Sequence, residues 1–429
     1  MLPFVFASFC IVWLTIFVMV HIQYPFWNIQ PIYHQYDYWR FIYTNPFIVH
    51  KQKPWKTKYL ETNHIFMFPF EDLNATQKHY FLRLLQGYTL PNDQNVLYTF
   101  NEQDFSLLFS EHIQPCYVSF YYHQMPSPSD KTITFHKVHY SIDPYATMYS
   151  IPVVMNFLPT ETSSEYVRLQ LPFHSHPVIK DEKDMHVIRQ LFQTHCYQYI
   201  VKHPDQKAAL FRKHGEPHNG IIPIVEWDSY TYYISKYPPM QKLDPYYVTH
   251  IHKNNQHILE TLFINEVSDP STRNPQHSPS QFSSTNYHKP FSLWITASMT
   301  HLLNLIKNQK VYVYVLMLKK SIQGIYIFTK RPIRYEEPEG MVLELTGSIS
   351  YQPNVQLFFK GFLQGVHNIM KTNKEYKYVS IQGNSHNTLL LPFWNKLVIP
   401  IQRDAVAYYT YNYIVPQSPF GAHSTFVLL

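Results

Sequence analysis

Helix-like and strand-like segments alternate along the chain, and this pattern restricts the fold more than any other feature. Apolar residues three and four positions apart predict helices over 73–90, 184–200, 254–263, 294–307 and 355–373. Runs of β-branched and aromatic residues predict strands, among them 150–158, 166–173, 220–227, 376–382 and 405–415. Both halves have a similar order of helix, antiparallel strands, helix and strand. The sequence therefore predicts an α/β (α+β) protein and is compatible with an internal duplication, although no residue-level repeat proves one.

Length and composition restrict the class of protein. A chain of 429 residues is too long for one ordinary core and indicates two domains or one two-lobed body. Hydrophobic residues make up 45% and charged residues 15%, so most of the chain can fold. Only 10 glycines are present, which argues against glycine-rich phosphate loops. The net charge of +6 is scattered, so we expect no nucleic-acid partner, but this charge suits an anionic ligand such as a CoA ester.

The cysteines and histidines form no recognisable metal site. Cys10, Cys116 and Cys196 lie far apart, which argues against a disulfide framework and favours a reducing compartment. The segments 174–176 (His-Ser-His) and 194–196 (Thr-His-Cys) could suggest zinc, but 25 histidines make chance pairs common and no ligand spacing accompanies them. We therefore expect no metal, and we place Cys196 in the core rather than assigning it as a nucleophile.

The N-terminal segment is uncharged and apolar. Residues 2–20 carry no charged side chain and are long enough to cross a bilayer as a helix. A single-pass membrane anchor over residues 1–22 is the favoured interpretation; a cleaved signal peptide and a buried core helix are the alternatives. Basic residues soon after the segment place the body on the cytoplasmic side of the membrane: Arg40, Lys51, Lys53, Lys56 and Lys58.

Four ordered segments resemble the N-myristoyltransferase family. YPFWNIQPI (24–32) resembles a stretch near the start of that family's catalytic domain. The segments 84–109, 355–387 and 407–429 resemble its acceptor loop, a helix–strand pair and its C-terminal end (AYYTYNYIVPQSPFGAHSTFVLL). The resemblance spans residues 24–429 and is specific in combination rather than in any single piece.

The resemblance implies two fused GNAT-like acyl-CoA N-acyltransferase halves related by a pseudo-twofold axis. Residues 23–245 would bind myristoyl-CoA as co-substrate, and residues 246–429 would bind an acceptor peptide with an N-terminal glycine. Residues 267–290, rich in Pro, Ser, Asn and Gln, are expected to form a mobile loop. The acyl chain would pass from the thioester to the glycine amine in a monomer with no permanently bound cofactor.

The resemblance also implies roles for individual residues. The terminal carboxylate of Leu429 would act as the base, and the backbone amides of Ser175 and His176 would hold the oxyanion. CoA would be contacted by Tyr24, Phe26, Trp27, Lys180, Lys183 and His186, with its phosphates at the start of the helix that follows. The acceptor peptide would be contacted by Asp93, Tyr98 and Phe100. Tyrosines alternate along the predicted strand 405–415, so one face would be core and the other, with Tyr409 and Tyr411, could line the peptide groove.

This chain departs from the family pattern in its phosphate loop and its acceptor loop. Asp181, Glu182 and Asp184 oppose phosphate binding, and the family's acidic acceptor loop is reduced to residues 92–95. A noncatalytic membrane-anchored binder of acyl-CoA or acylated peptides is therefore the alternative hypothesis. An acyl-CoA amine acyltransferase for another chain length is a third. The scarcity of glycine and the abundance of Asn, Tyr and His suggest a large DNA virus as the source, which would place the protein in a host membrane or a virion.

Overall fold

The computed structural model describes residues 2–37, 45–52, 56–87, 96–123, 143–160, 163, 165–181, 183–235, 238–252, 255–259 and 291–429. The predicted loop over 267–290 and the predicted ligand Asp93 lie outside these residues. The longer helices are α1 (Leu2–Gln23), α2 (Ala75–Gln86), α3 (Glu102–Leu108), α4 (Met185–Lys202), α6 (Met299–Lys307), α7 (Val355–Thr372) and α8 (Asn387–Trp394).

Strands occur in both halves of the chain. The first half contains β1 (Phe47–Ile48), β2 (Ile65–Pro69), β3 (Val96–Tyr98), β4 (Tyr117–Tyr121), β5 (Ala146–Phe157), β6 (Val167–His174), β7 (Val178–Ile179), β8 (Ala209–His214) and β9 (Val225–Tyr233). The second half contains β10 (Tyr246–Ile251), β11 (Leu293–Thr296), β12 (Val311–Leu318), β13 (Ser321–Glu336), β14 (Glu339–Ser350), β15 (Tyr376–Gln382), β16 (Gln402–Tyr411), β17 (Tyr413–Ile414) and β18 (Thr425–Leu428).

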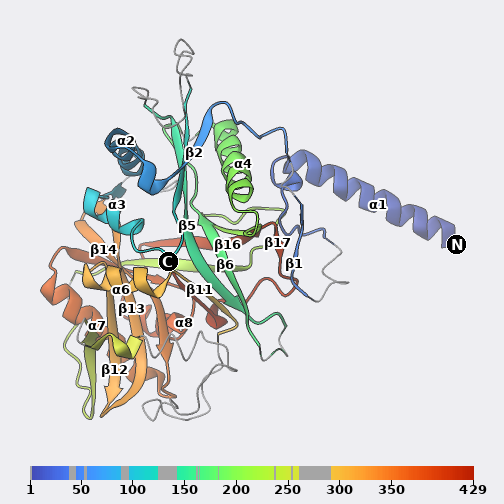
Figure 1. Cartoon of the computed structure of the whole chain (residues 1–429). Coiled ribbons are helices and arrows are strands. Elements are labelled where there is room, and N and C mark those ends of the chain that lie inside the picture. Colours follow the sequence, from blue (N-terminus) through green and yellow to red (C-terminus); the bar gives the residue numbers. More distant parts are fainter. Residues whose placement is uncertain are drawn as a thin grey trace.

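One large sheet connects the two halves (Figure 1). Its strand order is β10-β12-β13-β14-β15-β9-β16-β8-β6-β5-β11-β18, with β2, β3, β4 and β7 attached beside this path. The pairs β6–β8, β14–β15 and β11–β18 are parallel, and the other pairs in the sheet are antiparallel. This mixed α/β architecture confirms the predicted fold class.

The same supersecondary unit occurs twice. In the first half, β6 is followed by α4 and by β8, which lies parallel to β6. In the second half, β14 is followed by α7 and by β15, which lies parallel to β14. This repeated topology supports the internal duplication that the order of predicted elements suggested.

The helices form where capping side chains and apolar stripes coincide. Asn74 and Gln77 make a capping box at the start of α2, and Asn354 accepts a hydrogen bond from Leu357 N at the start of α7. The buried face of α7 repeats at helical spacing and includes Phe358 and Phe362. Two clusters of buried hydrophobic residues in the body of the protein are important for the candidate site.

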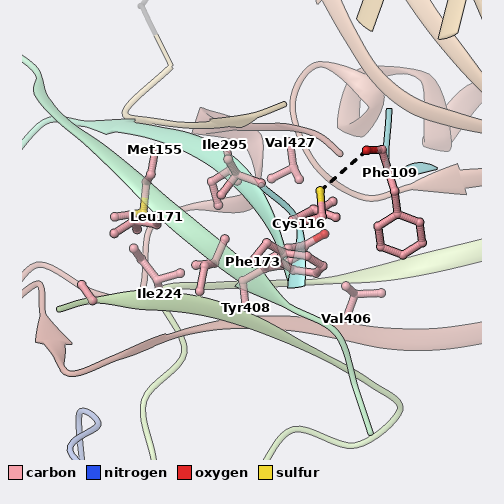
Figure 2. Packing of buried hydrophobic residues seen from close by; sticks show 14 of the residues in the cluster. Phe109, Cys116, Met155, Leu171, Phe173, Ile224, Ile295, Val406, Tyr408 and Val427 are labelled. Atoms are coloured by element: carbon pink, nitrogen blue, oxygen red, sulfur yellow. Dashed lines mark hydrogen bonds between the residues drawn. The ribbon is translucent and has the colours of Figure 1, made fainter. Parts of the chain in front are cut away.

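The first of these, the central core cluster, includes Leu171, Phe173, Val406, Tyr408 and Val427 (Figure 2). The second, the collar cluster, includes Phe26, Ile32, Phe192, Phe211 and Tyr409 and lies between α4 and the segment after α1.

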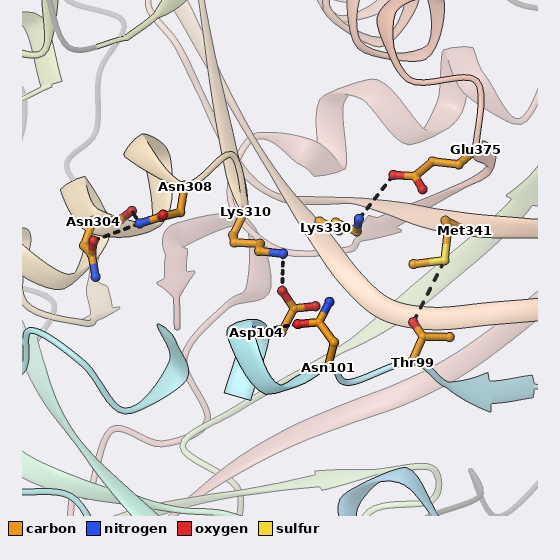
Figure 3. Close-up of polar contacts among 9 residues, drawn as sticks. All are labelled: Thr99, Asn101, Asp104, Asn304, Asn308, Lys310, Lys330, Met341 and Glu375. Atoms are coloured by element: carbon orange, nitrogen blue, oxygen red, sulfur yellow. Dashed lines mark hydrogen bonds and ion pairs between the residues drawn. The ribbon is translucent and has the colours of Figure 1, made fainter. Parts of the chain in front are cut away.

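The segment from β3 to α3 joins the first half to the second. β3 pairs with β13, and Asp104 at the start of α3 forms a partly buried ion pair with Lys310 (Figure 3). Asn101 caps α3 by accepting a hydrogen bond from Asp104 N, and Thr99 contacts Met341 Sδ. A second ion pair, Lys330–Glu375, lies nearby at 3.2 Å (Figure 3).

Other predictions differ in detail. The predicted helix over 294–307 begins as β11, because Trp294 and Ile295 pair with β5 and β18; helix α6 starts only after Ser298, which caps it. The predicted N-terminal helix forms as α1, which projects from the body (Figure 1). Within the described part of the chain, no helix has both the length and the apolar content needed to cross a membrane. The predicted membrane anchor is therefore unsupported.

Candidate functional site

A pocket of about 750 Å³ opens where two parallel strands separate, and we call it the strand-gap pocket. β6 and β8 pair only through Phe173 with Leu210 and His174 with Phe211. Beyond this point β6 ends, whereas β8 continues to His214. The walls are residues 23–27, 175–177 and 211–219, together with Ile179 and one side of α4.

The separation of the strands follows from local hydrogen bonds. Ser175 N donates to Tyr149 O at 2.8 Å, and Ser175 Oγ accepts a hydrogen bond from Tyr149 N at 3.0 Å. Both bonds hold the chain against β5, away from β8. Pro177 has no N–H with which to pair again. The gap is therefore a consequence of how β6 ends.

Aromatic rings of the segment after α1 form one wall. Trp27 stacks on Phe211 with ring centroids 5.6 Å apart and meets Phe192 edge-on at the same distance. Phe26 is buried against Tyr59 and Phe192. Tyr24, Phe26 and Trp27 all line the pocket, so the structure brings the three aromatic residues predicted to contact CoA to one place.

Three basic side chains line the same pocket: Arg189 on α4, and Arg212 and Lys213 at the end of β8. Glu216 is the single acidic residue among the lining residues of the described chain. Burial tends to lower the pKa of Arg212, but the hydrogen-bonded Tyr408 hydroxyl raises it above its usual value. The pocket therefore has a positive lining that suits an anionic ligand.

Three histidines add donors and acceptors without adding charge at neutral pH. Burial, with a contribution from Lys213, lowers the pKa of His176 to about 4 and that of His218 to about 3. The pKa of His214 is also far below its usual value because the ring is buried and Arg212 lies near it. These imidazoles are neutral near pH 7, and a bound anion would raise their pKa values.

The strand register sends the cations of β8 to opposite faces of the sheet. Arg212 lies opposite Tyr408, and Lys213 lies opposite Ala407. Tyr408 belongs to the central core cluster, against which Leu429 also packs, whereas Ala407 belongs to the collar cluster. Because side chains alternate along a strand, Arg212 points to the Leu429 face and Lys213 to the collar face.

The residues predicted to hold phosphate do not line this pocket. Lys180 pairs with Asp143 at 2.5 Å, and Asp184 caps α4 by accepting a hydrogen bond from Val187 N at 3.2 Å. Lys183 and His186 are exposed outside the lining. The cations that do line it were missed, although the consecutive basic residues of FRKH (211–214) were a signal for them.

The predicted oxyanion residues and the predicted base have different positions. Ser175 and His176 line the pocket, but the Ser175 amide already donates to Tyr149 O, so its proposed role as an oxyanion donor has no support. Leu429 follows β18, is half-buried and packs against the central core cluster. The C-terminus lies in the middle of the fold (Figure 1), although Leu429 is not among the pocket residues.

Two of the five residues predicted to contact the peptide are buried. Tyr409 and Tyr411 are 1% and 2% exposed and lie in the collar cluster, where Tyr409 stacks on Phe211. Both rings are therefore covered in this structure, and their contact with an acceptor peptide stays a prediction. Tyr98 lies at the end of β3, and Phe100 packs partly against the central core cluster.

The histidine-containing motifs lie close together without forming a metal site. His174 and His195 are fully buried with ring centroids 4.8 Å apart, and His195 Nδ1 contacts Ser119 Oγ at 2.7 Å. Among the described residues, no group of three or more His, Cys, Asp or Glu side chains could hold a metal ion. Cys196 is buried, as its position in the helix predicted.

Comparisons with known proteins identify the fold. No family sequence model and no curated protein sequence matches this chain. A crystal structure of Saccharomyces cerevisiae N-myristoyltransferase with bound myristoyl-CoA matches 91% of this chain and 87% of that chain, with a TM-score of 0.63 and 12% identity. Another, with myristoyl-CoA and inhibitors, matches 91% and 90%, with a TM-score of 0.63 and 11% identity. The chain therefore has the fold of these enzymes.

Proposed function

We propose that this protein is an acyl-CoA N-acyltransferase, which moves an acyl chain from a CoA thioester to an amine. The strand-gap pocket carries the proposal, because it combines an aromatic wall with Arg189, Arg212 and Lys213. CoA offers phosphates for the cations and an adenine for the rings. A pocket of about 750 Å³ is in the size range of ligand sites.

Myristoyl-CoA is the donor and an N-terminal glycine the acceptor in this proposal. The solved N-myristoyltransferases with this fold contain myristoyl-CoA, which supports the choice of donor. All residues that line the pocket fall within 23–219, in the half predicted to bind acyl-CoA. The acceptor peptide would then approach from residues 246–429.

The chemistry needs a neutral amine and a place for the charge that develops. The amine nitrogen attacks the thioester carbon, the C–N bond forms, and the C–S bond breaks. A base accepts the proton that the amine loses, and the departing thiolate then takes up this proton. An α-amino group has a pKa of about 7.7–8.0, so a modest base is sufficient near neutral pH. We assign this role to the terminal carboxylate of Leu429, a residue that packs against the central core cluster on the Arg212 face of the sheet.

The test uses the full chain with myristoyl-CoA and a peptide that begins with glycine. We expect one free thiol and one acylated peptide per turnover, measured by thiol titration and mass spectrometry. The same peptide with an acetylated N-terminus should release no thiol. Removal of Leu429 should slow turnover far more than it weakens acyl-CoA binding. Failure to bind any acyl-CoA would refute the proposal.

A noncatalytic acyl-CoA binder is the second candidate. The observation that favours it is the occupied Ser175 amide, together with Asp184 at the start of α4. Tight acyl-CoA binding without thiol release, with every glycine peptide tried, would select this candidate over the enzyme.

A further inference from the structure

The transition state of thioester attack places negative charge on the carbonyl oxygen, and an acyltransferase must supply donors for it. The end of β6 is poor in such donors. The Ser175 amide donates to Tyr149 O at 2.8 Å. Pro172 and Pro177, on either side, have no N–H at all. A donor from across the gap can take the place of the Ser175 amide.

Arg212 lies at the corresponding position on the facing strand. The β6–β8 pairing ends at His174 with Phe211, so Ser175 and Arg212 are the next residues on each side of the gap. Both line the pocket. Arg212 is the first residue of β8 whose backbone has no partner in β6, and it lines the pocket that opens at this point.

Neighbouring side chains fix the Arg212 guanidinium in place. Its central carbon lies 5.9 Å from the centre of the Phe173 ring, and the neighbouring Tyr408 hydroxyl raises its pKa. Glu344, which also pairs with Arg331, contributes favourable charge. A guanidinium has five N–H donors and stays charged, so several donors remain for a ligand. The group is therefore preorganised rather than mobile.

We propose that Arg212 is a catalytic residue that holds the developing oxyanion of the thioester, in a role the backbone amide of Ser175 cannot fill. This inference rests on the proposed acyltransferase function. As the amine nitrogen bonds to the carbonyl carbon, the carbonyl π electrons move to oxygen, and an Arg212 N–H donates a hydrogen bond to the oxyanion that forms. When the C–S bond breaks, the carbonyl re-forms and the guanidinium is unchanged.

Lys213 provides the internal contrast. It is adjacent in sequence and lines the same pocket, but it points to the collar face, towards α4 and Arg189. From that position it can bind an anionic group of CoA without reaching the Leu429 face. Substitution of Lys213 should therefore affect only the binding of acyl-CoA, whereas substitution of Arg212 should affect the polarisation of the thioester carbonyl.

The experiment compares Arg212→Met, Arg212→Lys and Lys213→Met in the full chain, with exposed Arg168→Met on β6 as the matched control. Bound myristoyl-CoA labelled with ¹³C at the thioester carbonyl is measured by infrared spectroscopy, and single-turnover transfer is measured in parallel. In the unaltered protein we expect the carbonyl stretching frequency to be lower than that of acyl-CoA in water. In Arg212→Met the frequency should return towards the value in water. Transfer should fall about 10²–10³-fold, as on removal of an oxyanion donor elsewhere.

The remaining outcomes separate the two proposals. Arg212→Lys should keep part of the frequency shift, whereas Lys213→Met should raise the dissociation constant and keep the shift. Arg168→Met should resemble the unaltered protein. If Arg212→Met binds acyl-CoA with an unchanged carbonyl frequency, the inference is wrong and a backbone donor such as His176 acts instead. If neither the unaltered protein nor any of the variants binds acyl-CoA, the proposed function fails as well.

Discussion

A methyl group added at Gly347 should displace the C-terminal strand that carries the proposed base. A Cβ at Gly347 in β14 would lie 2.8 Å from Phe426 Cε2, about 0.6 Å short of the 3.4 Å at which ordinary contact begins. Phe426 is fully buried against Phe291 and Trp294, with ring centroids 5.7 and 4.7 Å away. Because the buried ring is packed against both neighbours, we expect β18 to shift with it.

The size of both effects can be worked out from this overlap. Overpacking of a buried site costs about 1–3 kcal/mol of stability. Leu429 lies three residues beyond Phe426, and a misplacement of about 1 Å can slow catalysis roughly 10²-fold. For the smaller shift at Gly347 we expect a loss of roughly tenfold in single-turnover transfer, with acyl-CoA affinity retained.

Gly361→Ala is the matched control. Its Cβ would lie 2.5 Å from Tyr326 Oη, which donates to Phe358 O at 2.6 Å, so it overpacks α7 away from β18. Both variants should unfold at lower urea concentration, but only Gly347→Ala should transfer the acyl chain more slowly. If Gly347→Ala loses stability and transfers as fast as Gly361→Ala, the Leu429 carboxylate does not act as a closely positioned base.

Three further outcomes are expected. Burial lowers the pKa of His174 from 6.5 to about 3, so as the pH falls the unfolded chain binds a proton at this position before the folded chain does. The free energy of unfolding should therefore fall as the pH drops below 6.5, by about 2 kcal/mol at pH 5. His174→Phe should remove this pH dependence when the free energy of unfolding is measured by urea titration at each pH. Arg189→Met should weaken acyl-CoA binding about tenfold in calorimetry at low salt, with a smaller effect at high salt; an equal effect at both would exclude a phosphate contact. A thiol reagent should modify exposed Cys10 in the native protein and reach buried Cys116 and Cys196 only after unfolding; early labelling of either would contradict their burial.

The fold class could be predicted because long elements have strong periodicity. Phe358, Phe362, Val366 and Ile369 mark one face of α7, and its predicted range of 355–373 is close to the observed helix. The error over 294–307 shows the limit of this method. Trp294 fits an apolar helical stripe as well as a strand, and only its pairing with Asn156 on β5 decides between them.

The aromatic part of the site could be predicted, but its charged part could not. The aromatic segment 24–32 was identified by its local resemblance, and Tyr24 and Trp27 do line the strand-gap pocket. Arg212 and Lys213 were missed because their importance depends on the register between β6 and β8, which no local pattern specifies. Tyr409 was assigned to a peptide groove because alternation suggested one open face, but a strand inside a large sheet has both faces covered.

The motif His174-Ser175-His176 shows why residue spacing alone could not settle the site. His174 and His176 are two positions apart, and in a continuous strand this spacing would place both imidazoles on one face, as a metal site would need. β6 ends at His174, however, and the two bonds between Ser175 and Tyr149 redirect the chain. His174 therefore stays in the core against His195, while His176 turns into the pocket. The same hydrogen bonds that open the strand-gap pocket thus separate the two rings, and they occupy the amide whose role we assign to Arg212.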